Sequence, residues 1–175
     1  MIKAIVIVVV VAIAGVLAYA ATQPNTFRVQ RSTVIQAPPG EVYAIVEDLD
    51  RGKEWSPFEK KDPNLKRSRS GPPKGKGSVY SFEGNSEVGA GSLTVLDTVP
   101  PNKLVLALDM TKPMEGHNTV EFTLVPEGSG TRLTWSIFGP MPFISKVMCV
   151  FIDMDKMIGR EFESGLASLK ALAEK

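Results

Sequence analysis

Hydrophobic positions follow three different patterns along the chain, and each pattern predicts a different kind of element. Residues 4–21 are apolar or glycine without a polar interruption, as in a helix that faces lipid on every side. Between 77 and 139, apolar and polar residues alternate with the period of two that is typical of strands. From Phe143 onward, apolar residues recur every three or four positions, which indicates one face of an amphipathic helix.

The last pattern predicts a single long helix from Phe143 to the C-terminus. It would begin after Pro140 and Pro142, because proline is tolerated only in the first turn of a helix. No later residue is expected to break it, so its length would be about 45 Å. A helix of that length needs a wide sheet to cover its apolar side. The residues of the apolar stripe are Phe143, Val147, Phe151, Met154, Ile158, Phe162, Leu166, Leu169 and Leu172.

The middle of the chain predicts such a sheet. Short separators rich in glycine, proline and asparagine connect the alternating segments, which favours hairpins and an antiparallel meander. Pro38 and Pro39 end the first strand, and residues 41–49 have the spacing of a short helix. Residues 60–76 are basic and polar, and they are expected to form a solvated loop with at most an edge strand. The predicted strands are 27–36, 77–83, 88–98, 103–110, 119–126 and 131–138.

The N-terminal apolar segment has the properties of a membrane-targeting sequence, with two interpretations. As a helix of roughly 18 residues it would span about 27 Å, near the thickness of the hydrocarbon core, which favours a retained single-pass anchor. Residues 18–20, Ala-Tyr-Ala, also fit a cleavage site, so the alternative is a secreted or periplasmic protein. Lys3 favours a cytoplasmic N-terminus although Arg28 and Arg31 lie beyond the other end, and the domain is expected to be extracytoplasmic. The expected division is 1–22 as transmembrane anchor or signal segment, 23–26 as linker, and 27–175 as one ligand-binding domain.

Composition argues against several classes of function. Lys and Arg number 20 against 19 Asp and Glu, and this net charge of +1 gives no general attraction to nucleic acid. No aromatic residues interleave with the cations of 60–76, so a stacking platform for bases is missing there. Cys149 and His117 are the only cysteine and histidine, which rules out an internal disulfide and leaves no ligand set for zinc or iron. No metal and no cofactor is therefore expected.

Four segments resemble a known superfamily when they are taken in order. They are Ala37–Tyr43, Trp55–Phe58, Gly130–Trp135 and Phe162–Lys170. In this order, after a single N-terminal membrane segment, they are similar to bacterial members of the START-like, SRPBCC superfamily, in the group called polyketide cyclase/dehydrase and lipid transport proteins. The resemblance covers 27–175 and implies an α+β helix-grip fold, in which a curved antiparallel sheet wraps around the long C-terminal helix. It also implies a mostly apolar cavity between sheet and helix.

Aromatic and aliphatic side chains on the helix-facing side of the sheet are candidate walls of that cavity, and Tyr80 and Trp135 are able to offer a hydrogen bond to a ligand. His117 shares strand parity with polar residues and is expected to face solvent. No serine or cysteine near it has the spacing of a nucleophile pair, so no catalytic residue is assigned. The cavity candidates are Trp55, Phe58, Tyr80, Phe82, Leu106, Phe122, Trp135, Phe151 and Met154.

The leading functional hypothesis is a membrane-anchored domain that binds a lipid or another hydrophobic small molecule without turnover. The alternative is a polyketide cyclase or aromatase-like enzyme, which requires a buried polar pair, such as Tyr80 with a strand carboxylate, inside the cavity. A second alternative is an envelope interaction domain with a filled core. A cavity below about 300 Å³ would favour it, because drug-sized ligands need more room.

Overall fold

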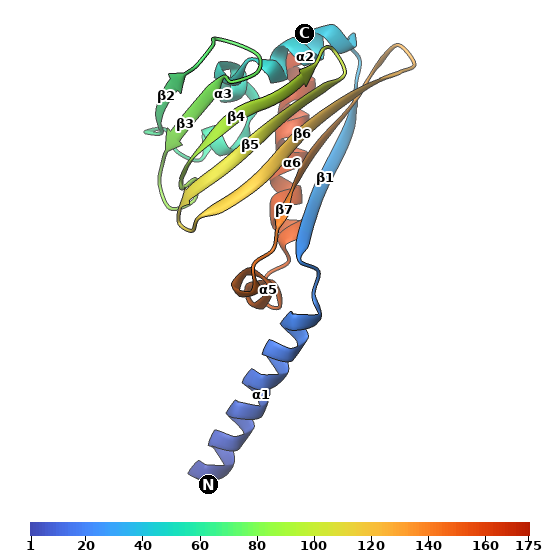
Figure 1. Ribbon diagram of the computed structural model, residues 1–175. Helices are drawn as coiled ribbons and strands as arrows, with labels where there is room; N and C mark the ends of the chain where they lie inside the picture. Colours follow the sequence, from blue (N-terminus) through green and yellow to red (C-terminus); the bar gives the residue numbers. More distant parts are fainter.

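A computed structural model describes residues 1–175 and shows an α+β domain from which one helix projects (Figure 1). The projecting helix is α1, Ile2–Thr22. The strands are β1 (Thr26–Ile35), β2 (Lys66–Ser70), β3 (Val79–Glu83), β4 (Ala90–Val99), β5 (Lys103–Lys112), β6 (Gly116–Glu127) and β7 (Gly130–Pro140). The other helices are α2 (Pro39–Glu47), the 3-10 turn η1 (Leu49–Arg51), α3 (Gly52–Trp55), α4 (Pro57–Lys60), α5 (Phe143–Cys149) and α6 (Met154–Ala173).

The seven strands form one curved antiparallel sheet in the order β1-β7-β6-β5-β4-β3-β2. Only the β1–β7 pair joins strands distant in sequence, so the rest is the predicted meander. The register places Phe122 opposite Trp135 and Leu106 opposite Val120, on the face that looks toward α6. Register shifts in β4 after Ala90 and Val95 mark irregularities, and such bulges bend a strand and increase its twist.

The core lies between this face of the sheet and α6, as the alternation of apolar residues predicts. Helix α6 crosses β1, while α2, α3 and α4 close the remaining sides. Phe162, Leu166 and Leu169 turn the apolar side of α6 into the core. The predicted strand and short-helix boundaries are confirmed to within about three residues, and residues 66–70 of the basic segment form the expected exposed edge strand β2.

The prediction of one unbroken C-terminal helix is wrong. Helix α5 ends at Cys149 and α6 begins only at Met154, so α6 has 20 residues and is about 30 Å long. The break is set by Asp153, whose backbone is extended and whose carboxylate accepts a hydrogen bond from the Lys156 backbone N–H at 3.0 Å. Aspartate competes well for this capping role because it satisfies a free donor of the first turn. The spacing of apolar residues continues across this break because both helices have an apolar face, so the spacing does not reveal the break.

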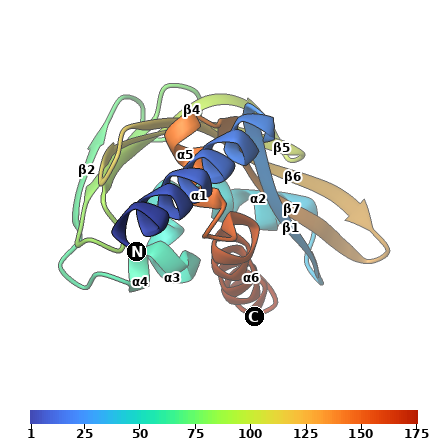
Figure 2. The same ribbon diagram turned by 90° about the horizontal axis from the view of Figure 1, so that it is seen from below.

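Helix α1 stands outside the domain, and α5 lies between α1 and the lower end of α6 and the sheet (Figures 1 and 2). Helices α1 and α5 are in contact, and Ala20 in the last turn is the one buried residue of α1. Helix α1 is long and apolar enough to cross a membrane, and a signal sequence has the same properties.

Candidate functional site: an aromatic interior

Four aromatic rings meet at the centre of the core. The Trp135 ring lies parallel to Phe162, with centroids 4.0 Å apart and an interplanar angle of 9°. Phe122 stacks against Trp135 at 5.3 Å, and Trp55 meets Trp135 edge-on at 5.3 Å. Offset and edge-to-face pairs of this kind contribute about 0.5–1.5 kcal/mol each beyond burial. The cluster of Trp55, Phe122, Trp135 and Phe162 is called the aromatic interior below.

Three different structural layers supply these rings. Phe122 and Trp135 sit on the cross-strand pair of β6 and β7, Trp55 ends the short helix α3, and Phe162 comes from α6. Gly165 makes the close approach of α6 possible. A methyl group at Gly165 would lie 2.7 Å from Trp135 Cζ3 and 2.9 Å from Pro57 Cδ, which is too close for any real contact.

The aromatic interior contains two hydrogen-bond donors that have no acceptor in the protein. Trp55 Nε1 and Trp135 Nε1 are both buried, and neither makes a hydrogen bond. A buried donor without a partner costs about 1–3 kcal/mol, and such groups are uncommon in native proteins. A bound molecule that brings an oxygen atom to these indoles would remove that cost. The aromatic interior is thus apolar in bulk and carries two unpaired hydrogen-bond donors.

A polar group lies at the edge of the interior, where α4 approaches the sheet. The Tyr80 hydroxyl donates a hydrogen bond to Glu59, and Arg67 Nε donates to Glu59 Oε2 at 2.8 Å. Burial, and then the hydrogen bond to Glu59, raise the pKa of Tyr80 well above its usual range. The phenol therefore stays protonated and acts as a donor. The carboxylate partner of Tyr80 comes from α4 and not from a strand, and Arg67 neutralises it.

The structure brings together most of the residues that the sequence singled out as cavity walls. Trp55, Phe122 and Trp135 form the centre, and the ring centroid of Phe58 lies 6.5 Å from that of Trp135. Leu106 belongs to the same buried core, whereas Tyr80 is buried outside this core cluster, and Phe82 and Met154 are half-buried.

Phe151 does not join this group. It lies in the turn between α5 and α6 and is 74% exposed, because the chain leaves the helix before reaching it. Phe162, in contrast, was not among the candidates although it stacks directly on Trp135. It belongs to the apolar stripe of the helix, and that stripe was the signal that could have identified it.

The remaining reactive groups lie away from the interior. His117 is exposed, as its strand parity predicts, and its Nδ1 lies 2.6 Å from Asp109 Oδ1. Cys149 is half-buried in α5, and burial raises the pKa of its thiol. No three His, Cys, Asp or Glu side chains are grouped so that they could hold a metal ion.

Two of the hollows on the surface are well defined by their lining residues, and neither of these two includes a residue of the aromatic interior. One, of about 420 Å³, lies where β1 and β7 pair near the end of α1 and is lined by Thr26, Phe27, Arg28, Phe138 and Gly139. The other, of about 300 Å³, lies at the β3–β4 turn and is lined by Gly84, Asn85, Ser86, Gly89, Lys112 and Pro113. Both are open to solvent, so the hydrophobic interior and the surface hollows are separate features.

A curved antiparallel sheet closed by a long C-terminal helix around an apolar interior defines the helix-grip class of α+β proteins, a fold that binds hydrophobic ligands. The chain belongs to the polyketide cyclase / dehydrase and lipid transport family, whose model matches residues 26–174. This match confirms the resemblance seen in the sequence. A comparison with curated proteins finds no match.

Solved structures show the same fold at low sequence identity. The Aha1 dimer from Colwellia psychrerythraea has a TM-score of 0.61 and 19% identity over 85% of this chain and 96% of that one. A protein of unknown function from Staphylococcus aureus has a TM-score of 0.64 and 13% identity over 85% of this chain and 94% of that one. A Chromobacterium violaceum protein has a TM-score of 0.59 and 20% identity over 87% of this chain and 99% of that one. These similarities concern the fold.

Proposed function

We propose that this protein binds a lipid or another hydrophobic small molecule between the sheet and α6, without chemical turnover. The ligand class is an apolar chain or ring that carries an oxygen acceptor. The observation that carries the proposal is the pair of buried, unpartnered indole donors, Trp55 Nε1 and Trp135 Nε1, within the aromatic interior. An oxygen atom placed between apolar walls would satisfy them, and such sparse polar contacts orient ligands in apolar pockets.

The proposal includes the membrane. Helix α1 has 21 residues, or about 31 Å, which matches a hydrocarbon core of about 30 Å. We propose that α1 is retained as a single-pass anchor and that the domain lies on the extracytoplasmic side. The intact mass of the chain extracted from membranes tests retention, because cleavage after Ala20 would remove the first 20 residues.

The enzyme alternative receives less support from the geometry. The Tyr80–Glu59 pair is the buried polar pair nearest to what a cyclase would need, but Arg67 neutralises the carboxylate and the phenol holds its proton tightly. A base with a neutralised charge and an acid with a raised pKa are both poorly matched to proton transfer near neutral pH.

A second candidate function is an interaction domain with a filled core. The observation in its favour is the close packing of the aromatic interior, in which Trp135 and Phe162 stack at 4.0 Å and Gly165 leaves no spare room. In this alternative the indole donors stay unpaired, and partners bind at the outer surface.

The two tryptophans of the chain make a direct test possible, because both lie in the aromatic interior. The full chain is placed in lipid nanodiscs with 15N-labelled tryptophan, which gives two indole N–H resonances. Methyl laurate supplies an apolar chain with an oxygen acceptor, and a hydrocarbon of equal length is the matched probe without an acceptor. We expect methyl laurate to move both indole proton resonances downfield, because its ester oxygen accepts hydrogen bonds. The hydrocarbon has no acceptor and should not cause this downfield shift.

Two variants sharpen the result. Trp55→Phe and Trp135→Phe each assign one resonance and remove one donor while keeping an aromatic ring. Each is expected to weaken binding by about 1 kcal/mol, or roughly fivefold, the usual net value of a hydrogen bond. Tyr19→Phe, which removes a hydroxyl in α1 outside the interior, should leave binding unchanged. If no apolar probe changes the chemical shifts of the indole N–H groups, the ligand-binding proposal is wrong and the filled core is favoured.

A further inference from the structure

The exposed apolar side chains of the domain are concentrated in one short stretch. Besides α1, the exposed large hydrophobic residues are four scattered positions, Leu96, Val99, Met114 and Val125, and six positions within residues 143–157. These six, called the basal patch, are Phe143, Ile144, Met148, Phe151, Ile152 and Met157. Single exposed apolar residues are ordinary, but a cluster of this kind marks a binding surface.

The basal patch is fixed next to the end of α1. Lys146 in α5 donates hydrogen bonds from Nζ to the Gln23 carbonyl at 2.9 Å and to Asn25 Oδ1 at 2.6 Å. The Met141 backbone N–H donates to the Asn25 carbonyl at 2.7 Å. These bonds join the segment before α6 to the linker that follows α1. Seen from below, α5 lies beside the end of α1 that joins the domain (Figure 2).

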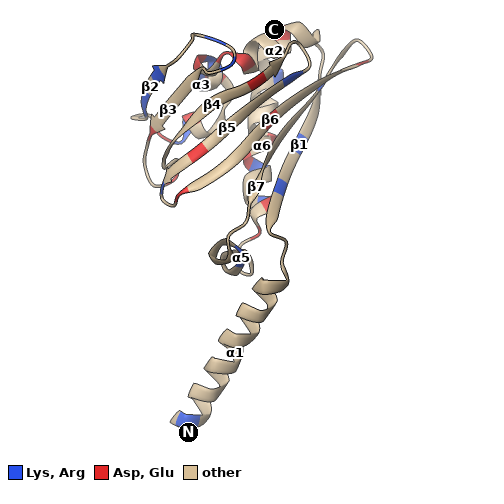
Figure 3. Ribbon diagram, viewed as in Figure 1, with Lys and Arg blue, Asp and Glu red and all other residues tan.

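The segment that carries most of the patch exposes no charge. Lys146 is the only ionisable side chain other than Cys149 between residues 141 and 152, and it is only 6% exposed because its ammonium group faces the linker. Charges are absent from α1 beyond Lys3 and are found across the rest of the domain (Figure 3). No charged side chain therefore separates the apolar surface of α1 from α5 along residues 4–27.

We propose that the basal patch lies in the membrane, with α5 and the α5–α6 turn inserted at the boundary of headgroups and acyl chains on the side where α1 leaves the bilayer. The inference rests on the retention of α1 proposed above. Because α1 is about as long as the hydrocarbon core is thick, the last turn of α1 reaches that boundary. This last turn contains the buried residue Ala20, and α1 is in contact with α5. Interfacial helices bury an apolar face about 5–10 Å deep at this level.

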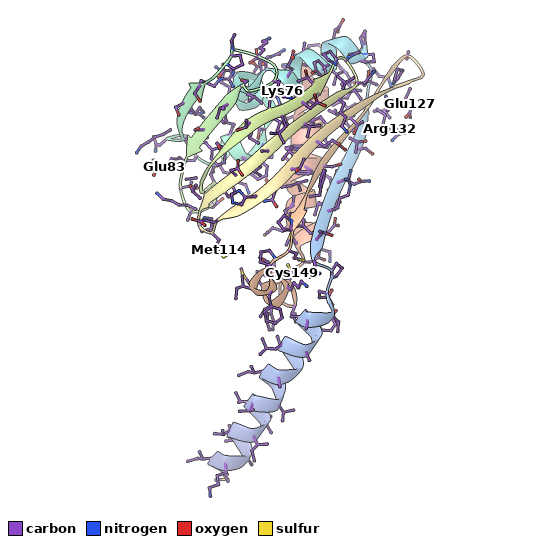
Figure 4. The ribbon with its side chains drawn as sticks, in the orientation of Figure 1. Lys76, Glu83, Met114, Glu127, Arg132 and Cys149 are labelled. Atoms are coloured by element: carbon purple, nitrogen blue, oxygen red, sulfur yellow. The ribbon has the colours of Figure 1, made fainter.

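The position of the patch favours lipid over a protein partner. It is continuous with the apolar surface of α1, and in Figure 4 Cys149 and Met114 lie at this lower end while Lys76, Glu127 and Arg132 lie at the opposite end. Tyr19 is exposed in the last turns of α1, at the level where tyrosine is enriched in membrane proteins. A second copy of the chain on the patch is an outcome of the test below.

The test places an environment-sensitive NBD fluorophore at single cysteines in the full chain, in phosphatidylcholine vesicles. In a Cys149→Ser background the labelled variants are Phe151→Cys in the patch, Ser129→Cys in the distal β6–β7 turn, and Val10→Cys in the middle of α1. We expect the label at 151 to be blue-shifted and quenched by lipids with a nitroxide near the headgroup. The label at 129 should be quenched by aqueous iodide, and the label at 10 by lipids with a deep nitroxide.

The three labels separate the possible failures. Iodide quenching at 151 equal to that at 129, with the label at 10 still in lipid, would overturn the inference and leave the anchor intact. A label at 151 that escapes both lipid nitroxides and iodide but shows self-quenching would assign the patch to a second copy, and this also overturns it. An aqueous label at 10, or a mature chain that lacks residues 1–20, would overturn both the anchor and the inference.

Charged substitutions provide a second readout on the native cysteine. With NBD on Cys149, the double variant Phe151→Asp and Ile152→Asp should lose most of the lipid quenching, because it places two charges at the boundary. Val125→Asp is the control: it places one aspartate at an exposed apolar residue of β6 toward the β6–β7 turn, away from the basal patch. It should leave the quenching unchanged. Equal quenching in all three proteins would overturn the inference.

Discussion

Two neighbouring pieces of the C-terminal segment carry the same sequence pattern and have opposite surroundings. Residues 154–173 form α6, whose apolar side is buried by the sheet, with Phe162 and Leu169 inside. Residues 143–152 continue the same spacing of apolar residues, but Phe151 and Ile144 are exposed. Periodicity therefore reports that a face is apolar, and it does not report whether protein or lipid covers that face.

The largest expected difference between the two pieces is in the stability of the domain. Phe162→Ala removes a ring stacked on Trp135 and leaves a cavity, so it should lower the free energy of unfolding by about 3–5 kcal/mol. Phe151→Ala is the matched change in the exposed piece and should alter the free energy of unfolding by about 0.5 kcal/mol or less. Denaturant unfolding of the full chain in a neutral detergent, followed by tryptophan fluorescence, measures both. Similar losses in both variants would mean that the domain itself covers Phe151.

A glycine substitution tests how tightly α6 is held against the sheet. Gly165→Ala introduces a methyl group 2.7 Å from Trp135 Cζ3, so α6 or the indole has to shift, at a cost of about 1–3 kcal/mol. At Gly40 near the start of α2, a methyl group would meet nothing within 4 Å. Gly40→Ala should therefore be neutral or stabilising by up to about 1 kcal/mol. The same unfolding measurement reports both, and a neutral Gly165→Ala would reveal unused space in the interior.

The smallest expected effect lies at the junction of the two pieces, in the first turn of α6. Arg31 of β1 bonds to Asp155 at 2.9 Å and to Glu163 at 2.7 Å, and the hydrogen bond from Arg31 to Asp155 holds the pKa of the Asp155 carboxyl below its usual value. Because the folded pKa is the lower one, the pair stabilises the fold above the unfolded pKa of about 4 and loses that contribution as pH falls through the folded pKa.

The measurement compares the wild type with Asp155→Asn. At neutral pH the wild type should be slightly more stable in urea, and the difference should shrink below about pH 4 as Asp155 is protonated. Arg51→Gln is a control on another exposed ion pair, Arg51–Glu54, which does not involve α6. An Asp155→Asn difference that persists unchanged in acid would assign the effect to the helix geometry and not to the ion pair.

The sheet and its buried face could be predicted from the sequence because alternation and turn residues are local signals. Trp135, Phe122 and Leu106 were placed correctly on the buried face for this reason. The break at Asp153 was missed because one capping hydrogen bond decides it, and a capping residue resembles any other polar residue of a helix. The unpartnered indole donors could not be predicted from the sequence, because whether a donor lacks an acceptor depends on the positions of all neighbouring residues in the fold.

The short linker sets the working range of the domain. Only residues 23–25 separate α1 from β1, and three residues extend at most about 11 Å. Lys146 shortens even this reach, because it bonds to both Gln23 and Asn25. If α1 is retained as the proposed anchor, the domain would be unable to ferry cargo between two membranes. In that case it would exchange molecules with the lipid that surrounds it, and its encounters would be governed by lateral diffusion in one leaflet.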